Sequence, residues 1–408
     1  MKRVDLLVVG GGAAGIFAAI TAKAAFPKAS VLVVEKTGSL LSKVRVSGGG
    51  RCNVTHNCFD PPLLSKNYPR GEKELYGAFH HFQPKDMIAW LEARGVVLKA
   101  EEDGRIFPKS DSSQTIIDCL LGEAEKLGVA IERFVKIESA QKVGNHFELT
   151  LKEGEGISAD ALILSTGSSA EGHKIAAQFG HTIVPAVPSL FTFNIPHSPL
   201  SELSGTSVDP VEVEVLGFKR VQKGPLLITH FGFSGPAILK LSAFAARFLH
   251  DTGYKAEVKI NWLPDLSLDE IQQVLFKLKE SSPASSLQTS SPFAFSKRLW
   301  GHFCARFELA GAMRDLSKTG LRHLALALNR DCYRIDGKTT NKEEFVTCGG
   351  VCRKEINFKT MESKKVPGLY FAGEVVNIDG ITGGFNFQNA WTTAFFAGRN
   401  GLLHSFSW

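Results

Sequence analysis

Residues 4–15 read VDLLVVGGGAAG. The apolar run before the glycines predicts a short buried strand, and residues 16–25 carry apolar side chains at helical spacing. The glycines form a G-x-G-x-x-G pattern at Gly10, Gly12 and Gly15. In such a unit the first glycine permits a tight turn, the second lets a pyrophosphate approach the backbone, and the third allows the helix to pack closely on the strand. This stretch therefore predicts a dinucleotide-binding turn with phosphate at the helix N-terminus.

A second buried-strand pattern, Val31–Val34, ends on an acidic residue, Glu35. Glu35 follows Gly15 by about 20 residues, the spacing expected for a ribose-binding acid. Its carboxylate can accept hydrogen bonds from the ribose hydroxyls and would repel a 2′-phosphate. The predicted ligand is therefore an adenine dinucleotide without that phosphate.

The last part of the chain contains another strand, glycine turn and helix. Residues 368–374 form an apolar run that ends in glycine and glutamate, and Asn386–Ala397 is an apolar helix pattern. Between the two ends, Ala161–Leu164 predicts a strand that leads into Thr166 and Gly167. Since parallel sheets bind ligands at the carboxyl ends of their strands, the chain is expected to return to the cofactor site. A dehydrogenase that binds only NAD needs no such return, so FAD fits this pattern better.

Composition places the chain among large globular proteins. It has 408 residues, 44% of them hydrophobic, and a net charge of +6 that is scattered rather than gathered into tracts. This charge neither demands nor excludes an anionic partner such as RNA. Seven cysteines, an odd number in a long chain, favour reduced thiols and a cytoplasmic protein. The basic and then apolar N-terminus imitates a signal peptide, but Asp5 and four glycines interrupt it, so we expect neither secretion nor a membrane segment.

The middle of the chain has a different pattern, which predicts an inserted module. Val211–Val215 and Lys255–Ile260 alternate as half-exposed strands do. Ser234 as N-cap and Pro236 in the first turn predict a helix over Ala237–Leu249. We therefore expect one discontinuous nucleotide-binding domain, with its N-terminal part at 1–190, an inserted substrate or cap domain at 191–342, and its C-terminal part at 343–408.

Several longer motifs together resemble one known family. They are SGGGRCNVT at 47–55, THFGFSGPA at 229–237, VTCGGV at 346–351, TMES at 360–363 and the stretch at 368–388 that begins GLYFAGE. With the N-terminal glycine turn they run in order from residue 4 to about residue 400. In these motifs the chain resembles the BaiN/RdsA-type flavoproteins, also called YhiN-like or aminoacetone-oxidase-like NAD(P)/FAD-dependent oxidoreductases.

The resemblance implies both a fold and an activity. The implied fold is α/β, a discontinuous Rossmann-like FAD-binding domain with an inserted β-barrel-like plus helical domain. The implied activity is an FAD-dependent oxidoreductase that reduces an activated carbon–carbon double bond by hydride transfer from reduced flavin, with NAD(P)H as a transient electron donor. Members are connected with steroid enones and with uracil in ribosomal RNA, which gives dihydrouridine. The implied partner is thus a small-molecule or RNA substrate, with no membrane and no metal.

The resemblance also assigns cofactor contacts. The glycine turn would hold the pyrophosphate, Glu35 the adenosine ribose, and the Val135 backbone the adenine. Lys43 and the loop 47–53 would line the flavin and its ribityl chain, and the segment around Gly384 would face the flavin's pyrimidine edge. The full set is Gly10, Gly12, Ala13, Ala14, Gly15, Glu35, Lys36, Lys43, Ser47, Gly49, Gly50, Arg51, Cys52, Asn53, Val135, Thr166, Gly167, Gly373, Glu374, Gly384, Asn386 and Phe387.

Some positions depart from the family pattern. Ser42 precedes Lys43 where an arginine is usual, and Asn377 stands where an aspartate is common. The stretch 168–173 replaces a longer glycine-rich loop that borders the substrate site in relatives. Substrate choice therefore does not transfer directly from the family.

The cysteines and histidines are the residues on which a redox disulfide, a metal site or proton transfer would depend. Cys52 and Cys58 lack the spacing of a redox dithiol, and no fourth ligand completes a zinc site with them. His230, between an apolar strand and a glycine turn, is the candidate proton donor, although a histidine at a strand end can also cap backbone groups. Two other classes remain open, an FAD-dependent oxidase of small amines and a non-enzymatic flavin-binding interaction protein.

Overall fold

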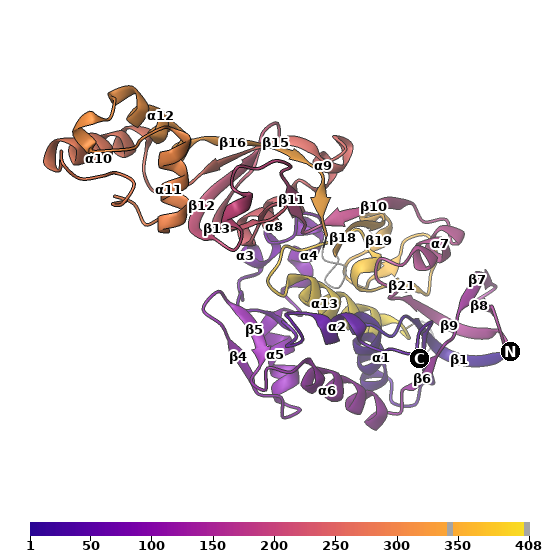
Figure 1. The fold of residues 1–408 in the computed structure, drawn as a ribbon. Helices are drawn as coiled ribbons and strands as arrows, with labels where there is room; N and C mark the ends of the chain where they lie inside the picture. Colours follow the sequence, from indigo (N-terminus) through magenta and orange to yellow (C-terminus); the bar gives the residue numbers. More distant parts are fainter. Residues whose placement is uncertain (341–345, 404–408) are drawn as a thin grey trace. The chain divides into compact units, whose positions relative to one another are not determined.

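The computed structural model describes residues 1–340 and 346–403. The α/β class is confirmed: helices and strands alternate along the chain, and they gather into two compact units. The first unit comprises Met1–Pro188 and Lys342–Trp408, and the second comprises Ser189–Asn341. Each unit is described by itself below (Figure 1).

A parallel sheet forms the centre of the first unit. Its strands follow the order β21-β9-β1-β2-β6, and every neighbouring pair in this order is parallel. Buried aliphatic side chains fill β1 and β2, as expected for a sheet covered on both faces. The chain order puts β1 between β2 and β9, so the direction of winding reverses beside β1. The strands are β1 (Lys2–Val9), β2 (Val31–Glu35), β6 (Ala130–Arg133), β9 (Ile157–Leu164) and β21 (Leu369–Phe371).

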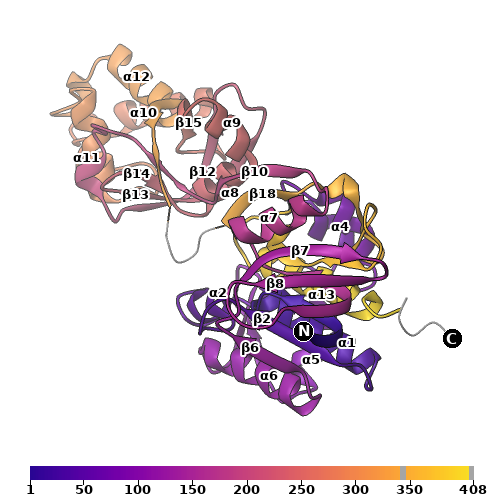
Figure 2. The same cartoon turned by 90° about the vertical axis from the view of Figure 1, so that its right-hand side faces the viewer.

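Antiparallel strands extend this sheet on the side of β9 that faces away from β1. The hairpin of β7 (Ile137–Val143) and β8 (His146–Leu151) pairs with β9, and Figure 2 shows its two strands running side by side. β20 (Glu362–Ser363) pairs with β21, and β19 (Ile356–Asn357) pairs with β20.

Two helices from opposite ends of the chain pack together against the sheet. α1 (Ala13–Ala25) contacts α13 (Phe385–Asn400), which contains the helix predicted at Asn386–Ala397. Their approach is close because a Cβ at Gly398 would lie 2.3 Å from the carbonyl oxygen of Ala18. The remaining elements of the unit are α2 (Ser42–Val46), β3 (Thr55–His56), α3 (Pro61–Ser65), α4 (Glu72–Ala78), α5 (Pro84–Glu92), β4 (Leu98–Ala100), β5 (Arg105–Pro108), α6 (Ser113–Lys126), α7 (Ala170–Gln178), β10 (Ile183–Ser189) and β18 (Val346–Val351).

The second unit is built on a seven-stranded antiparallel sheet in the order β16-β15-β12-β13-β14-β11-β17. The strands predicted at Val211–Val215 and Lys255–Ile260 are confirmed, and they are hydrogen-bonded neighbours. In the described chain the end strands β16 and β17 do not pair, so the barrel-like part is an open sheet. The strands are β11 (Thr192–Asn194), β12 (Ser207–Val215), β13 (Val221–Thr229), β14 (Gly232–Ser234), β15 (Lys255–Asn261), β16 (Asp331–Asp336) and β17 (Lys338–Thr339).

The helices of this unit correct one prediction from the sequence. The predicted N-cap Ser234 belongs to β14, where its hydroxyl accepts a hydrogen bond from Thr192 Oγ1 at 2.9 Å. Gly235, with φ of 92°, caps the helix instead, and the predicted single helix is divided at Ala245. The helices are α8 (Pro236–Phe244), α9 (Ala246–Asp251), α10 (Leu268–Ser281), α11 (Lys297–Arg306) and α12 (Lys318–Asn329).

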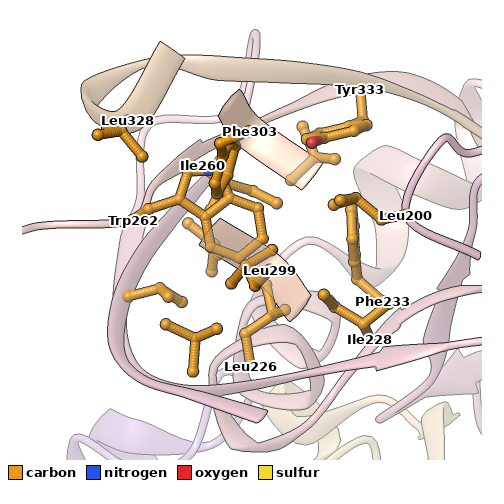
Figure 3. Close-up of a cluster of buried hydrophobic side chains, with 14 of the residues drawn as sticks. Leu200, Leu226, Ile228, Phe233, Ile260, Trp262, Leu299, Phe303, Leu328 and Tyr333 are labelled. Carbon is orange, nitrogen blue, oxygen red and sulfur yellow. The ribbon is translucent and has the colours of Figure 1, made fainter. Parts of the chain in front are cut away.

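Aromatic side chains from strands and helices meet in the core of the second unit. Figure 3 shows the indole of Trp262 beside Ile260 and Phe303, and the rings of Trp262 and Phe303 are 5.7 Å apart in an edge-on arrangement. Such geometry adds to the burial of apolar area. The indole N–H donates to the buried Asp331 carboxylate at 3.1 Å, so its polar atom is satisfied.

Residues 131–137 do not form one continuous strand. β6 ends at Arg133, Phe134 adopts φ of 62°, and β7 begins at Ile137. A left-handed residue cannot continue an extended strand, so the chain turns here. As a result Val135 lies in a short connection rather than inside a strand.

Candidate cofactor site

The three glycines of the N-terminal turn have different surroundings. A Cβ at Gly10 would lie 2.6 Å from the carbonyl oxygen of Ser165, and Gly10 has φ of 111°. A Cβ at Gly15 would lie 1.9 Å from the carbonyl oxygen of Gly10. At Gly12 a Cβ would meet nothing within 4 Å. Gly10 and Gly15 are therefore needed by the fold itself, whereas Gly12 leaves open space in front of the backbone.

That space lies at the N-terminus of α1. The helix begins at Ala13 with Gly12 as its N-cap, no side chain caps it, and its first turn contains no acidic residue. The first backbone N–H groups of a helix have no partner within the helix, and they carry the positive end of its dipole. The turn can accordingly bind an anion such as a pyrophosphate.

Glu35 organises the turn as well as ending β2. One carboxylate oxygen accepts a hydrogen bond from the Gly11 N–H at 2.9 Å. The other accepts hydrogen bonds from the N–H and the hydroxyl of Thr37, both at 2.9 Å. A carboxylate has about four acceptor sites, so capacity remains for a ribose hydroxyl.

A cavity of about 590 Å³ opens beside Glu35, within the size range of small-molecule and cofactor sites. Residues that follow β2 line one part of it, and residues that flank Val135 line another. The Val135 N–H donates to the Glu35 carbonyl at 2.9 Å, so the Val135 carbonyl is the group left for an adenine. The predicted contact residue Lys36 lies in the cavity wall and pairs with Glu171. The lining comprises Lys36, Thr37, Gly38, Phe134, Lys136, Lys152, Glu153 and Glu171.

The loop 47–53 has two glycines with open space beside the backbone. Gly49 and Gly50 have φ of 69° and 84°, and a Cβ on either would meet nothing within 4 Å. Ser47 uses its hydroxyl within the loop, donating to the Val44 carbonyl at 3.0 Å. Cys52 is fully buried, and burial raises the pKa of its thiol to about 12. The Cys52 thiol is thus neutral near pH 7, and among the described residues every cysteine is free of a disulfide.

Arg51 turns its guanidinium toward protein groups. It donates to Glu101 at 2.6 Å, lies 3.5 Å from Asp111 and covers the ring of Phe107 at 4.0 Å. The guanidinium therefore anchors the glycine loop to β5 and its neighbours. The flavin contact assigned to Arg51 stays a prediction.

Glu374 connects three segments at the carboxyl edge of the sheet. One carboxylate oxygen pairs with Lys43, and the other accepts a hydrogen bond from the Thr347 N–H at 3.0 Å. Gly167, with φ of 61°, lies in front of the same carboxylate, and Gly373 donates its N–H to the Thr393 hydroxyl at 2.8 Å. Thr347 was not predicted as a site residue, because its part is played by a backbone N–H that any residue type carries.

Thr166 lies beside this group with its hydroxyl oxygen buried and, within the described chain, without a hydrogen-bond partner. A Cβ at Gly172 would lie 1.7 Å from that oxygen, so α7 packs directly on it. The side chain of Thr166 is therefore covered by protein.

The N-terminus of α13 is fixed to the glycine-rich loop by Asn53. The Asn53 amide oxygen accepts a hydrogen bond from the Gly384 N–H at 2.9 Å, and its nitrogen donates to the Thr55 carbonyl at 3.0 Å. Gly384 is the N-cap, with φ of 91°, and a Cβ there would lie 2.5 Å from the Thr55 carbonyl oxygen. No side chain caps α13, and its first turn has no acidic residue. This second helix N-terminus thus has the same chemistry as that of α1.

The predicted contacts Asn386 and Phe387 use their side chains within the protein. The Asn386 amide accepts from the Gly380 N–H at 2.8 Å and donates to the Gly380 carbonyl at 2.9 Å. Phe387 stacks on Trp391 with ring centres 5.8 Å apart. Their backbone N–H groups remain as the parts that can face a ligand.

Three residues that the sequence did not single out hold the segment 379–385, which leads into α13. The Tyr68 hydroxyl donates to the Phe385 carbonyl at 2.7 Å. The guanidinium of Arg70 forms a forked ion pair with the fully buried carboxylate of Asp379. No local motif marks such long-range pairs, so only covariation among relatives could have revealed them.

His230 lies in the second unit, exposed in the turn between β13 and β14. Its assignment as a proton donor stays a prediction. No group of three or more histidine, cysteine, aspartate or glutamate side chains in the described residues could hold a metal ion. None of the helices described is both long and apolar enough to cross a membrane.

Comparisons with known proteins agree with the Rossmann-type fold of the first unit. A family model described as the HI0933-like protein Rossmann domain matches residues 4–400. The chain is 33% identical to the ribosomal RNA dihydrouridine synthase of Escherichia coli (strain K12), and the match covers 97% of each chain. It is 27% identical to the 3-dehydro-bile acid delta(4,6)-reductase of Clostridium scindens, over 98% of each. The solved 3-ketosteroid-delta4-(5alpha)-dehydrogenase from Rhodococcus jostii RHA1 shares the fold, with a TM-score of 0.51 and 14% identity over 98% of this chain and 97% of that one.

Proposed function

Because the chain belongs to the HI0933-like Rossmann family, we propose that it is an FAD-dependent oxidoreductase that reduces the activated carbon–carbon double bond of uracil in ribosomal RNA. The observation that carries this proposal is the 33% identity, over 97% of both chains, to a protein named for making dihydrouridine in ribosomal RNA. The relative at 27% identity is named for reduction at the delta(4,6) positions of a bile acid. Both names describe saturation of carbon–carbon double bonds, so the reaction class is shared while the substrates differ.

The residues at the edge of the parallel sheet fit FAD. The space in front of Gly12 and the uncapped start of α1 suit the pyrophosphate, and Glu35 with the adjoining cavity suits the adenosine. The open backbone of Gly49 and Gly50 and the uncapped start of α13 suit the flavin end. When bound and reduced, FAD would supply a hydride, which carries the two electrons that saturate the double bond.

The chain's own groups bind and orient in this scheme. The positive end of the α13 dipole favours negative charge at the pyrimidine edge that faces it. Lys43 and Glu374 form an ion pair, and both side chains would lie near the ribityl chain of bound FAD. His230 is the proposed donor of the proton that accompanies the hydride.

The electron donor in this proposal is a nicotinamide nucleotide. The sequence contains a single G-x-G-x-x-G unit after a strand, so NAD(P)H would bind transiently rather than in a second Rossmann motif. The free cysteines and the RNA substrate support a cytoplasmic location.

The test is the dihydrouridine content of ribosomal RNA from cells with and without this protein. Loss of dihydrouridine on deletion, restored by the wild-type chain but not by a Gly12→Ala chain that still folds, is expected. Unchanged dihydrouridine would refute RNA as the substrate. Release of hydrogen peroxide from small amines in air would instead identify an amine oxidase.

A further inference from the structure

One helix of the second unit has a basic outer face. α12 contains no aspartate or glutamate, and its exposed positions include Lys318, Arg322, His323 and Leu326, with exposed Arg330 at the C-cap. Residues four apart lie on the same side of a helix. At 1.5 Å per residue, Lys318 and Arg330 are about 18 Å apart along the helix axis, and Arg322 lies between them.

Lys318, Arg322 and Arg330 differ from several surface lysines of the same unit because, among the described residues, they have no carboxylate partner. Within the parts of the chain that the structure describes, no ion pair involves Lys318, Arg322 or Arg330, although Arg322 also lies 5.8 Å above the Phe276 ring. By contrast, three lysines on the sheet pair with carboxylates. These pairs are Lys223–Asp265, Lys255–Asp336 and Lys259–Glu214.

The opposite face of α12 is committed to the protein core. Leu321, Leu324 and Leu328 are fully buried in the apolar cluster of the unit, and α12 packs beside α10 (Figure 1). A helix that binds a membrane surface inserts its apolar face into the lipid. α12 has only Leu326, 47% exposed, among the apolar groups of its outer face, so lipid insertion has no basis here.

We propose that the outer face of α12 contacts the phosphate backbone of RNA. Cations that are not paired with carboxylates can neutralise phosphates, and such contacts position a nucleic acid without reading its sequence. This inference rests on the proposed function for the identity of the RNA. It adds the binding surface and its chemistry, which are separate from the cofactor site.

The test compares two triple variants that remove the same charge from the same unit. K318Q/R322Q/R330Q neutralises the α12 face, and K223Q/K255Q/K259Q neutralises three paired lysines on the sheet. Binding of a fluorescein-labelled, uridine-containing single-stranded RNA is followed by anisotropy across a salt series. Each lost phosphate contact lowers the salt slope by about 0.7, so the α12 variant loses about 2 in slope and about 100-fold in affinity near 0.1 M salt. The paired-lysine variant keeps a slope near that of the wild type.

The outcomes separate this inference from the proposed function. Both variants are checked for an unchanged melting temperature and unchanged FAD affinity, so that a folding defect is recognised. Equal loss in the two variants, or none in either, overturns the α12 surface. If the α12 variant loses binding to phosphatidylserine vesicles but keeps its RNA binding, the α12 surface for RNA is also overturned. An α12-dependent salt slope in a protein that forms no dihydrouridine supports the surface and refutes the proposed reaction.

Discussion

Replacing Gly12 with alanine separates cofactor binding from folding. A Cβ at Gly12 meets nothing within 4 Å, and its φ of −83° is ordinary for alanine. The stability of the protein without cofactor should therefore change by less than about 1 kcal/mol. The new methyl occupies the space assigned to the pyrophosphate, and overpacking of about 1–3 kcal/mol weakens FAD binding by about 10- to 100-fold.

Gly15→Ala is the matched control in the same turn. Its Cβ would lie 1.9 Å from the Gly10 carbonyl oxygen, so the helix must move from the strand. Overpacking of this kind costs about 1–3 kcal/mol, which lowers the free energy of unfolding even without cofactor. Gly12→Ala should thus weaken FAD binding and leave stability nearly unchanged, whereas Gly15→Ala should lower the free energy of unfolding even without FAD.

The assay pairs urea unfolding of the cofactor-free protein with titration of FAD by its fluorescence. The reasoning is refuted if Gly12→Ala binds FAD like the wild type. It is also refuted if Gly12→Ala loses as much stability as Gly15→Ala.

Further predictions concern the half-buried carboxylate of Glu355, the junction made by Asn53 and the Cys52 thiol. Burial acts to raise the pKa of Glu355, but hydrogen bonds from Lys365 and others outweigh it and hold that pKa at about 2, against the ordinary 4.5. Glu355 therefore contributes up to about 3 kcal/mol to the free energy of unfolding above pH 4.5, and this contribution is lost as the pH falls toward 2. Urea unfolding at a series of pH values should show the free energy falling over this range in the wild type and falling less in E355Q. Asn53→Ala removes the bonds to Gly384 and Thr55, and should cost about 1–3 kcal/mol in unfolding free energy and weaken FAD binding; unchanged FAD affinity would contradict the junction. Iodoacetamide should leave Cys52 unmodified in the native protein at pH 7, and mass spectrometry of its labelled peptide would expose an error.

The elements that depend on neighbours in the chain could be predicted from the local sequence. The turn at Gly10–Gly15, the acid at Glu35 and the parallel strands β1, β2, β9 and β21 follow from periodicity and from glycine geometry within short windows. The open Cβ position at Gly12 agrees with the role that the pattern predicted. The domain boundaries at 190/191 and 342/343 remain predictions about folding units.

The elements that depend on distant partners could not be predicted in this way. The end of β6 follows from the left-handed Phe134, and the cap of α8 follows from Ser234 being held by Thr192 in β14. The guanidinium of Arg51 is directed by Glu101, fifty residues later in the chain. In the serine-rich segment 281–292, Leu287 is fully buried and its carbonyl accepts the Trp300 indole N–H at 2.6 Å, a contact that the local composition does not indicate.

A single-turnover reaction tests the central claim most directly. The FAD-loaded protein is reduced without oxygen, freed of reductant, and mixed with ribosomal RNA that lacks dihydrouridine. The account predicts that the visible absorbance of oxidised flavin returns and that dihydrouridine forms in equal amount. Flavin that stays reduced in the presence of this RNA, or that reoxidises without forming dihydrouridine, would contradict it.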